Sequence, residues 1–313
     1  MFHAADVHGS EKAFLKFLNA GKFYKAHVIN LCGDLTGKVI VPIVEQADGS
    51  YRARFLGSEV VVKTKEELEA LKKNIRFNGQ YPYVTDPKEY EELNNNPRKV
   101  DELFSQLMVE QMERWIRIAE ERLRGTGIKC FIMPGNDDRF EIDAVFKGSN
   151  YVINPEGTVV DVDERHEMVS TGYANITPWK SPRDIPEEEL AKKIDAMVSQ
   201  VRDIKNCIFN FHCPPYDTSI DAAPKLDEQF RPKISPAGGF EMIPVGSISV
   251  RRAIEKYQPL LGLHGHIHES PGAFRLGRTL CLNPGSEYSE GILRGVLVRL
   301  ADKEVKSYMF TRS

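Results

Sequence analysis

The sequence contains no long apolar run. None of its stretches approaches the roughly 20 consecutive apolar residues that a membrane-spanning helix needs. Asp6 and His8 also fall in the region where a signal peptide would be apolar. We therefore expect a soluble protein that is not exported and has no membrane partner. The first predicted strand, 1–5, is unusually short, which leaves a start a few residues upstream open at this point.

The sequence also lacks paired cysteines. Its five cysteines lie far apart, mostly inside apolar runs, and no C-x-x-C pair suggests a zinc clip or a redox centre. They are Cys32, Cys130, Cys207, Cys213 and Cys281. We expect these thiols to be reduced and the protein to be cytoplasmic.

No basic tract, internal repeat or low-complexity segment is present either. The chain carries 42 Lys and Arg against 45 Asp and Glu, which gives a formal net charge of -3 and a pI near 6.3. This balance provides no global attraction to polyanions, so a nucleic-acid partner is not expected. With 313 residues, of which 41% are hydrophobic, the chain can bury one large core or two modest ones.

Short apolar runs recur along the chain, and each ends in a polar turn. They predict buried strands at 26–32, 128–133, 207–211, 259–263 and 279–282. Helical spacing of apolar residues predicts helices at 11–19, 97–124, 186–201 and 247–257. This alternation predicts an α/β core. A hairpin is predicted from 293–300 and 305–310, so the sheets are expected to be mixed.

Residues 37–96 interrupt this alternation of predicted strands and helices. They contain a predicted hairpin of 39–44 and 51–56, a charged helix at 65–73 and then a segment rich in Tyr, Pro and Asn. Because the insertion follows Asp34 directly, it emerges beside that residue. Two interpretations stay open: a cap or substrate-selecting wall, and a peripheral decoration or oligomer contact. The oligomeric state is unknown.

Potential ligands follow the ends of the predicted strands. They are Asp6-Val7-His8, Gly33-Asp34, Gly135-Asn136, His212 and Gly265-His266-Ile267-His268. Open α/β sheets build their ligand sites at the carboxyl ends of strands. A pair of divalent ions needs a bridging carboxylate, neutral imidazoles and glycines that allow tight turns. Mixed nitrogen and oxygen ligands favour manganese, iron, zinc, cobalt or nickel over calcium, and we expect manganese first.

The order D-x-H, G-D, G-N, strand-end His and G-H-x-H, from Asp6 to His268, resembles the calcineurin-like metallophosphoesterase family. Residues 283–286 are similar to the segment that follows G-H-x-H in that family. Residues 172–175 and 263–270 look like a prokaryotic branch related to cyclic-nucleotide phosphodiesterases. The resemblance implies one domain over 1–313, a four-layer α/β/β/α sandwich with two mixed sheets, into which 37–96 is inserted.

The resemblance also implies a ligand set and an activity. The first metal ion would be held by Asp6, His8, Asp34 and His268, and the second by Asp34, Asn136, His212 and His266. A hydroxide shared by the two ions would attack phosphorus, which makes the protein a metal-dependent hydrolase of a small phosphate ester, with a phosphodiesterase favoured. The alternatives are a phosphomonoesterase or phosphoprotein phosphatase, a nuclease, and a non-catalytic scaffold. Scaffolds of this fold lose ligands, whereas all seven are present here.

Three further residues are candidates for catalysis or substrate binding. Asp137 stands where the best-known family members have a His after Gly-Asn, and an ionised carboxylate is a poor proton donor. Esters with poor leaving groups are therefore not expected as substrates, unless His264 or the insertion supplies a proton. His264 is either a buried hydrogen-bonded histidine or a catalytic acid. Arg139 either binds a substrate phosphate or pairs with Asp137 or Asp138.

Overall fold

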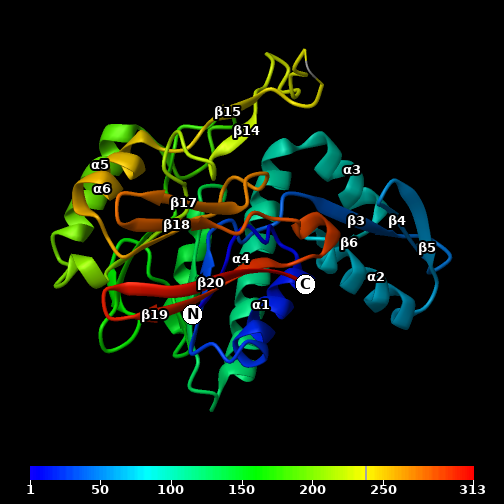
Figure 1. Cartoon of the computed structure of the whole chain (residues 1–313). Coiled ribbons are helices and arrows are strands. Elements are labelled where there is room, and N and C mark those ends of the chain that lie inside the picture. Colours follow the sequence, from blue (N-terminus) through cyan, green and yellow to red (C-terminus); the bar gives the residue numbers. More distant parts are fainter. Residues whose placement is uncertain (237) are drawn as a thin grey trace.

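Two six-stranded mixed sheets form the body of the protein (Figure 1), which a computed structural model describes for residues 1–236 and 238–313. The first sheet has the order β20-β19-β1-β2-β7-β8. Its strands are β1 (Phe2–Ala4), β2 (Val28–Cys32), β7 (Lys129–Met133), β8 (Val152–Ile153), β19 (Arg294–Ala301) and β20 (Glu304–Arg312). Strands β1, β2, β7 and β8 are parallel, whereas the predicted hairpin β19–β20 adds antiparallel strands at the edge.

The second sheet has the order β17-β18-β16-β13-β10-β9. Its strands are β9 (Val159–Asp161), β10 (Glu167–Thr171), β13 (Ile208–Phe211), β16 (Leu261–Leu263), β17 (Gly272–Leu276) and β18 (Thr279–Asn283). Its four central strands are parallel and its two edge strands are antiparallel. In both sheets the parallel strands therefore direct their carboxyl ends to one edge.

Three apolar layers hold the two sheets between helices. Helices α1 (Glu11–Phe23) and α4 (Pro97–Leu123) pack on the first sheet, where Phe14 stacks on Trp115 with ring centroids 4.1 Å apart. A middle layer joins the sheets through residues such as Phe131 and Leu261. Helices α5 (Glu187–Val198) and α6 (Ile248–Tyr257) cover the second sheet. The four-layer α/β/β/α sandwich is thereby confirmed.

The insertion forms a sheet of its own, which lies beside the body on the side opposite α5 and α6 (Figure 1). Its strands follow the order β5-β4-β3-β6, with β3 (Ile40–Glu45), β4 (Tyr51–Phe55), β5 (Ser58–Val62) and β6 (Tyr81–Thr85). Helix α2 (Lys65–Phe77) covers it, and Ile43, Leu71 and Ile75 belong to its separate apolar cluster. The predicted hairpin and charged helix are confirmed, whereas β6 and α3 (Pro87–Asn95) occupy the segment that had no prediction.

Smaller elements complete the chain. They are β11 (Ala174–Asn175), β12 (Asp184–Ile185), β14 (Ala222–Pro224), β15 (Met242–Pro244) and the 3₁₀ helices η1 (Phe140–Gly148), η2 (Ile204–Asn206) and η3 (Tyr288–Glu290). Strands β14 and β15 begin an arm that projects from the body (Figure 1). Within residues 1–236 and 238–313, none of the helices has the length and apolar character that crossing a bilayer requires.

Candidate metal centre

The loops that follow four parallel strands are joined in pairs by backbone hydrogen bonds. In the first sheet, Asp6 N–H donates to Gly33 O at 3.1 Å, and His8 N–H donates to Asp34 O at 2.9 Å. In the second sheet, Gly265 N–H donates to His212 O at 2.9 Å. Between the sheets, His266 N–H donates to the Asp6 carboxylate at 3.0 Å and His212 Nδ1 hydrogen-bonds Cys32 O at 2.8 Å, so the carboxyl ends of both sheets meet at a single place, as the position of the motifs predicted.

The predicted ligands gather there in two groups. Asp6, His8 and His268 form one group, and Asp34, His212 and His266 form the other; in each group one potential ligand atom per residue lies within 4.8 Å of the others. The resemblance implied the same division, with Asn136 added to the second group and Asp34 shared by both. The binding of ions by these groups stays a prediction.

Asp34 lies between the two groups. Its Oδ2 is 3.6 Å from His8 Nε2, and its Oδ1 is 3.3 Å from His212 Nε2. Nitrogen ligands about 2.1 Å from one metal ion lie about 3.0 to 3.4 Å from each other, and His8 Nε2 and His268 Nε2 are 3.1 Å apart. One carboxylate thus faces a histidine of each group, which is the arrangement of a bridging ligand.

Three buried polar atoms of the predicted ligands have no hydrogen-bond partner among the described residues: His8 Nδ1, Asn136 Oδ1 and His212 Nε2. His212 Nδ1 hydrogen-bonds Cys32 O at 2.8 Å, and its Nε2, 3.3 Å from Asp34 Oδ1, has no hydrogen-bond partner. Asn136 donates its amide to Asp184 Oδ1 at 3.0 Å, and its Oδ1 is unpartnered. Buried acceptors normally find donors. Metal ligands instead keep one atom free for the ion while a second contact orients the ring or amide. The residues present therefore fit a metal ion.

The shifted pKa values of Asp34 and His212 indicate that a bound cation would be stabilised in the centre. Burial raises the pKa of Asp34 to about 6, and the nearby carboxylates of Asp137 and Asp6 add to the rise. Burial alone would lower the pKa of His212, but Asp34 and Asp6 outweigh it and raise that pKa well above its ordinary value. A cation in the centre would neutralise the carboxylates of Asp34 and Asp6. His212 would then lose its proton.

Backbone strain is concentrated at the predicted ligands. Asp6, His8, Asp34 and His266 have positive φ angles of 56°, 38°, 52° and 68°. Such a conformation costs about 1–3 kcal/mol for a residue other than glycine and clusters at functional sites. Glycine is required beside them, because a Cβ on Gly33 would lie 2.3 Å from His212 Nδ1.

Asp138 stabilises the loops that carry Asp34 and Asn136, a role that the sequence analysis missed. Its fully buried carboxylate accepts from the backbone N–H groups of Leu35, Thr36 and Gly135, and from the Thr36 hydroxyl, at 2.6 to 3.1 Å. Hydrogen bonds to a charged acceptor contribute about 1.5–3 kcal/mol each. The loops after β2 and β7 are thereby held as one unit.

The segment from β11 to β12 positions the Asn136 loop and was also missed. Asp184 accepts from the Asn136 amide through Oδ1, while its Oδ2 accepts from Thr177 and Ser181. Arg183, which is 1% exposed, donates to Asp138 O at 2.9 Å. Asp184 thus holds Asn136 in the orientation that leaves its oxygen free.

Asp184→Asn is expected to lower manganese affinity at least about tenfold, the usual cost of losing a residue that orients a ligand. The new amide nitrogen would face either the Asn136 amide or the donors of Thr177 and Ser181, so one contact must break. Calorimetric titration with Mn²⁺ measures the change. Glu188→Gln, an exposed change on α5, is the matched control. Equal affinity in the two variants would contradict the positioning role.

Asp137 lies at the rim of the centre, where a carboxylate oxygen is within 4.8 Å of a His8 ring nitrogen and an Asp34 oxygen. It forms an ion pair with Lys38 and accepts from the Ser181 hydroxyl at 2.5 Å. Burial would raise the pKa of Asp137, but Lys38 and Ser181 outweigh burial and lower it to about 2. The carboxylate therefore stays ionised at neutral pH, as the sequence analysis expected.

The contacts of His264 and Arg139 favour structural roles. His264 is fully buried, its Nδ1 hydrogen-bonds Phe211 O at 2.9 Å, and burial lowers its pKa to about 4. This supports the interpretation as a buried hydrogen-bonded histidine, and its catalytic role stays untested. Arg139 pairs with Asp101 on α4 at 2.6 Å. The expected pairing with Asp137 or Asp138 is wrong, because Lys38 and backbone donors occupy those carboxylates. Substrate binding by Arg139 stays a prediction.

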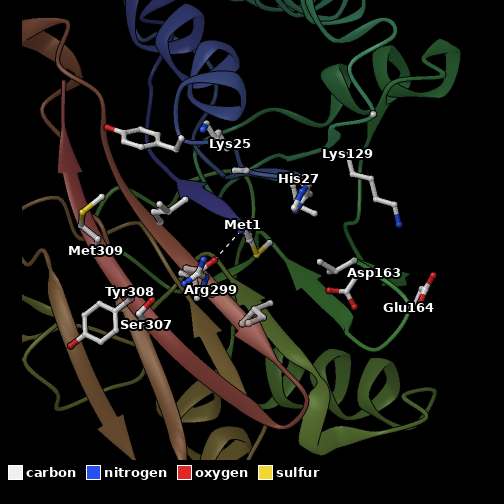
Figure 2. A pocket seen from close by; sticks show the side chains of 18 residues that line it. Met1, Lys25, His27, Lys129, Asp163, Glu164, Arg299, Ser307, Tyr308 and Met309 are labelled. Atoms are coloured by element: carbon white, nitrogen blue, oxygen red, sulfur yellow. Dashed lines mark hydrogen bonds between the residues drawn. The ribbon is translucent and has the colours of Figure 1, made fainter.

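A cavity of about 940 Å³ lies away from the predicted ligands. Met1, His27 and Lys129, at the amino ends of β1, β2 and β7, line it together with Asp163 and Arg299 (Figure 2). Because the predicted ligands follow the carboxyl ends of those strands, this cavity does not belong to the candidate metal centre.

A known protein sequence and two crystal structures are similar to this chain. No protein-family model matches the chain. An uncharacterized protein of Methanocaldococcus jannaschii, MJ1162, is 30% identical over 159 residues, which cover 50% of this chain and 64% of that relative, less than two thirds of its length.

Two crystal structures share the architecture. One superposes with a TM-score of 0.55 at 14% identity and covers 94% of this chain and 93% of the other. The second, TT1561 of Thermus thermophilus, has a TM-score of 0.51 at 16% identity and covers 94% and 92%. At these identities the likenesses show the fold alone.

Proposed function

We propose that this protein is a dinuclear-metal-dependent phosphoesterase, with a phosphodiesterase acting on a small phosphate ester as the favoured form. The observation that carries the proposal is the place of Asp34, whose two oxygens face histidines of two separate groups. The likeness of motif order to the calcineurin-like metallophosphoesterase family supports the same conclusion. Mixed nitrogen and oxygen ligands favour manganese, iron, zinc, cobalt or nickel, and manganese is expected first.

The chain's own residues would hold two ions and define the reaction site between them. Asp6, His8 and His268 would hold one ion, Asn136, His212 and His266 the other, and Asp34 both. When bound, the ions would activate water for attack on phosphorus and neutralise the phosphoryl oxygens. Cys32 and Asp184 orient His212 and Asn136 before any ion binds, which reduces the cost of ordering them.

The charge at the rim supports a preference among esters. Asp137, with its pKa of about 2, has no proton to give a leaving group at neutral pH. Diesters whose leaving group departs unaided are therefore favoured. Lys38, which offsets the charge of Asp137, keeps a phosphomonoesterase as the second candidate, because a monoester dianion would otherwise be repelled. A non-catalytic scaffold would not need the complete ligand set.

The proposal is tested by metal reconstitution. Protein freed of metal with a chelator is expected to regain hydrolysis of bis(4-nitrophenyl) phosphate on addition of Mn²⁺, and to hydrolyse 4-nitrophenyl phosphate more slowly. The two substrates share one leaving group, so their ratio reports the preference for diesters. If the chain bound two ions but hydrolysed no ester with manganese, iron, zinc, cobalt or nickel, a non-catalytic scaffold would be favoured instead.

A further inference from the structure

We propose that Lys38, at the root of the insertion, is the anion-binding residue of this centre and contacts a phosphoryl oxygen of the bound ester. This inference rests on the proposed function and deepens it, because it assigns to the insertion a direct part in substrate selection. None of the motifs in the sequence marked Lys38, since it lies outside every predicted ligand and strand end.

The position of the Lys38 ammonium follows from Asp137. One oxygen of that carboxylate accepts from Ser181, and the other, Oδ2, pairs with Lys38 Nζ. A carboxylate oxygen of Asp137 is also within 4.8 Å of ligand atoms of His8 and Asp34. The ammonium is therefore separated from the ligand groups by one carboxylate. Its side chain is 55% exposed, so Lys38 can also donate to a molecule that enters from solvent.

The backbone that carries Lys38 is fixed to the ligand loop. Gly37 N–H donates to the Tyr81 hydroxyl at 2.8 Å. A Cβ on Gly37 would lie 2.2 Å from Gly79 O, and a Cβ on Gly79 would lie 2.5 Å from His8 O. A Cβ on Gly9, beside His8, would lie 2.7 Å from both Gly37 N and Gly79 O, so the start of the insertion and its Gly79 turn both touch the loop of His8. This packing fixes the backbone of Lys38 against the loop of His8 and favours a wall over a peripheral decoration.

The ammonium group of Lys38 is chemically suited to bind an anion beside Asp137. A lysine presents three N–H donors on a compact charge, and one donor is used by Asp137, which leaves two for an anion. Phosphate oxygens that face away from the two ions need a further cation, and lysine is a common phosphate ligand. The competing explanation is that Lys38 only neutralises Asp137, as an exposed ion pair of little energetic weight.

Binding of inorganic phosphate to the full-length, Mn²⁺-loaded protein separates these explanations. Lys38→Gln is expected to weaken phosphate binding in calorimetric titration by about tenfold, both in the wild type and in an Asp137→Asn background, because one charge-assisted hydrogen bond is lost in each. If Lys38 only neutralised Asp137, its loss would weaken binding only while that carboxylate is present. Lys38→Arg is expected to retain most of the affinity, because it keeps the charge. Lys65→Gln, an exposed change on α2 of the same insertion, is the matched control and should bind as the wild type does. Manganese content is measured in every variant.

Equal phosphate affinity with and without Lys38 in the Asp137→Asn background, at equal manganese content, would overturn the proposal. So would a Mn²⁺-loaded wild type that binds no phosphate. Phosphate binding that depends on Lys38, in a protein that hydrolyses no ester, would support the anion site and overturn the proposed hydrolase function. The two failures are therefore distinguishable.

Discussion

Asp34→Asn is expected to lower the diesterase kcat/KM of the Mn²⁺-loaded protein by at least about 10³-fold, because it removes the one carboxylate shared by both ions. In the structure, Asp34 Oδ1 faces His212 and Oδ2 faces His8. An amide offers a single acceptor and no charge, so one of the two groups loses the oxygen that residue 34 would contribute. Metal content, measured by elemental analysis, is expected to fall with activity.

His264→Gln is the matched control for this experiment. It also alters a buried polar residue near the centre, but Gln keeps an N–H that can donate to Phe211 O. Its loss of kcat/KM should stay below about tenfold if the histidine only satisfies that carbonyl. Both variants are compared at equal thermal stability. Equal losses would mean that His264 takes part in catalysis, and an active Asp34→Asn with two ions would contradict the bridging role.

The gathering of the candidate ligands could be predicted because it depends on strand ends. Each predicted ligand follows an apolar run that forms a parallel strand, and such ends meet at one edge of a sheet. The helices α1, α4, α5 and α6 were predictable from apolar spacing, because each packs one face on a sheet. Spacing within a few residues therefore predicted the helices, the buried strands and the edge at which the candidate ligands meet, whereas the four-layer arrangement and the division of ligands between two ions were implied by the family resemblance.

The residues that support the centre were not predictable, because their partners are distant in the sequence. Asn136 and Asp184 are separated by 48 residues, and Leu35 and Asp138 by 103. A single sequence contains no local signal for such pairs. Helix α3 was not predicted for a different reason. Asp86 at its N-cap and Pro87 in its first turn are a known signal for the start of a helix. The surrounding Tyr, Pro and Asn residues concealed it.

The close approach of two loops makes Gly135 as critical as the ligands beside it. A Cβ at this position would lie 2.2 Å from Asp34 Oδ1 and 2.3 Å from Asp34 N. The φ angle of Gly135 is outside the left-handed region, so alanine is permitted by the backbone and excluded only by this contact. The backbone nitrogen of Asp34 cannot rotate away as a flexible side chain could. The loop that carries Asp34 must therefore shift.

Gly135→Ala is expected to lower diesterase kcat/KM at least about 10²-fold, because misplacing a reacting group by about 1 Å has this effect. Overpacking should also lower the free energy of unfolding by about 1–3 kcal/mol. Gly148→Ala is the control: its φ is likewise outside the left-handed region, and no atom of the described residues lies within 4 Å of the new Cβ. Kinetics, metal content and urea unfolding of both variants provide the measurement. If Gly135→Ala kept full activity and both ions, the loops would not be closely packed and Asp34 would not depend on Gly135 for its position.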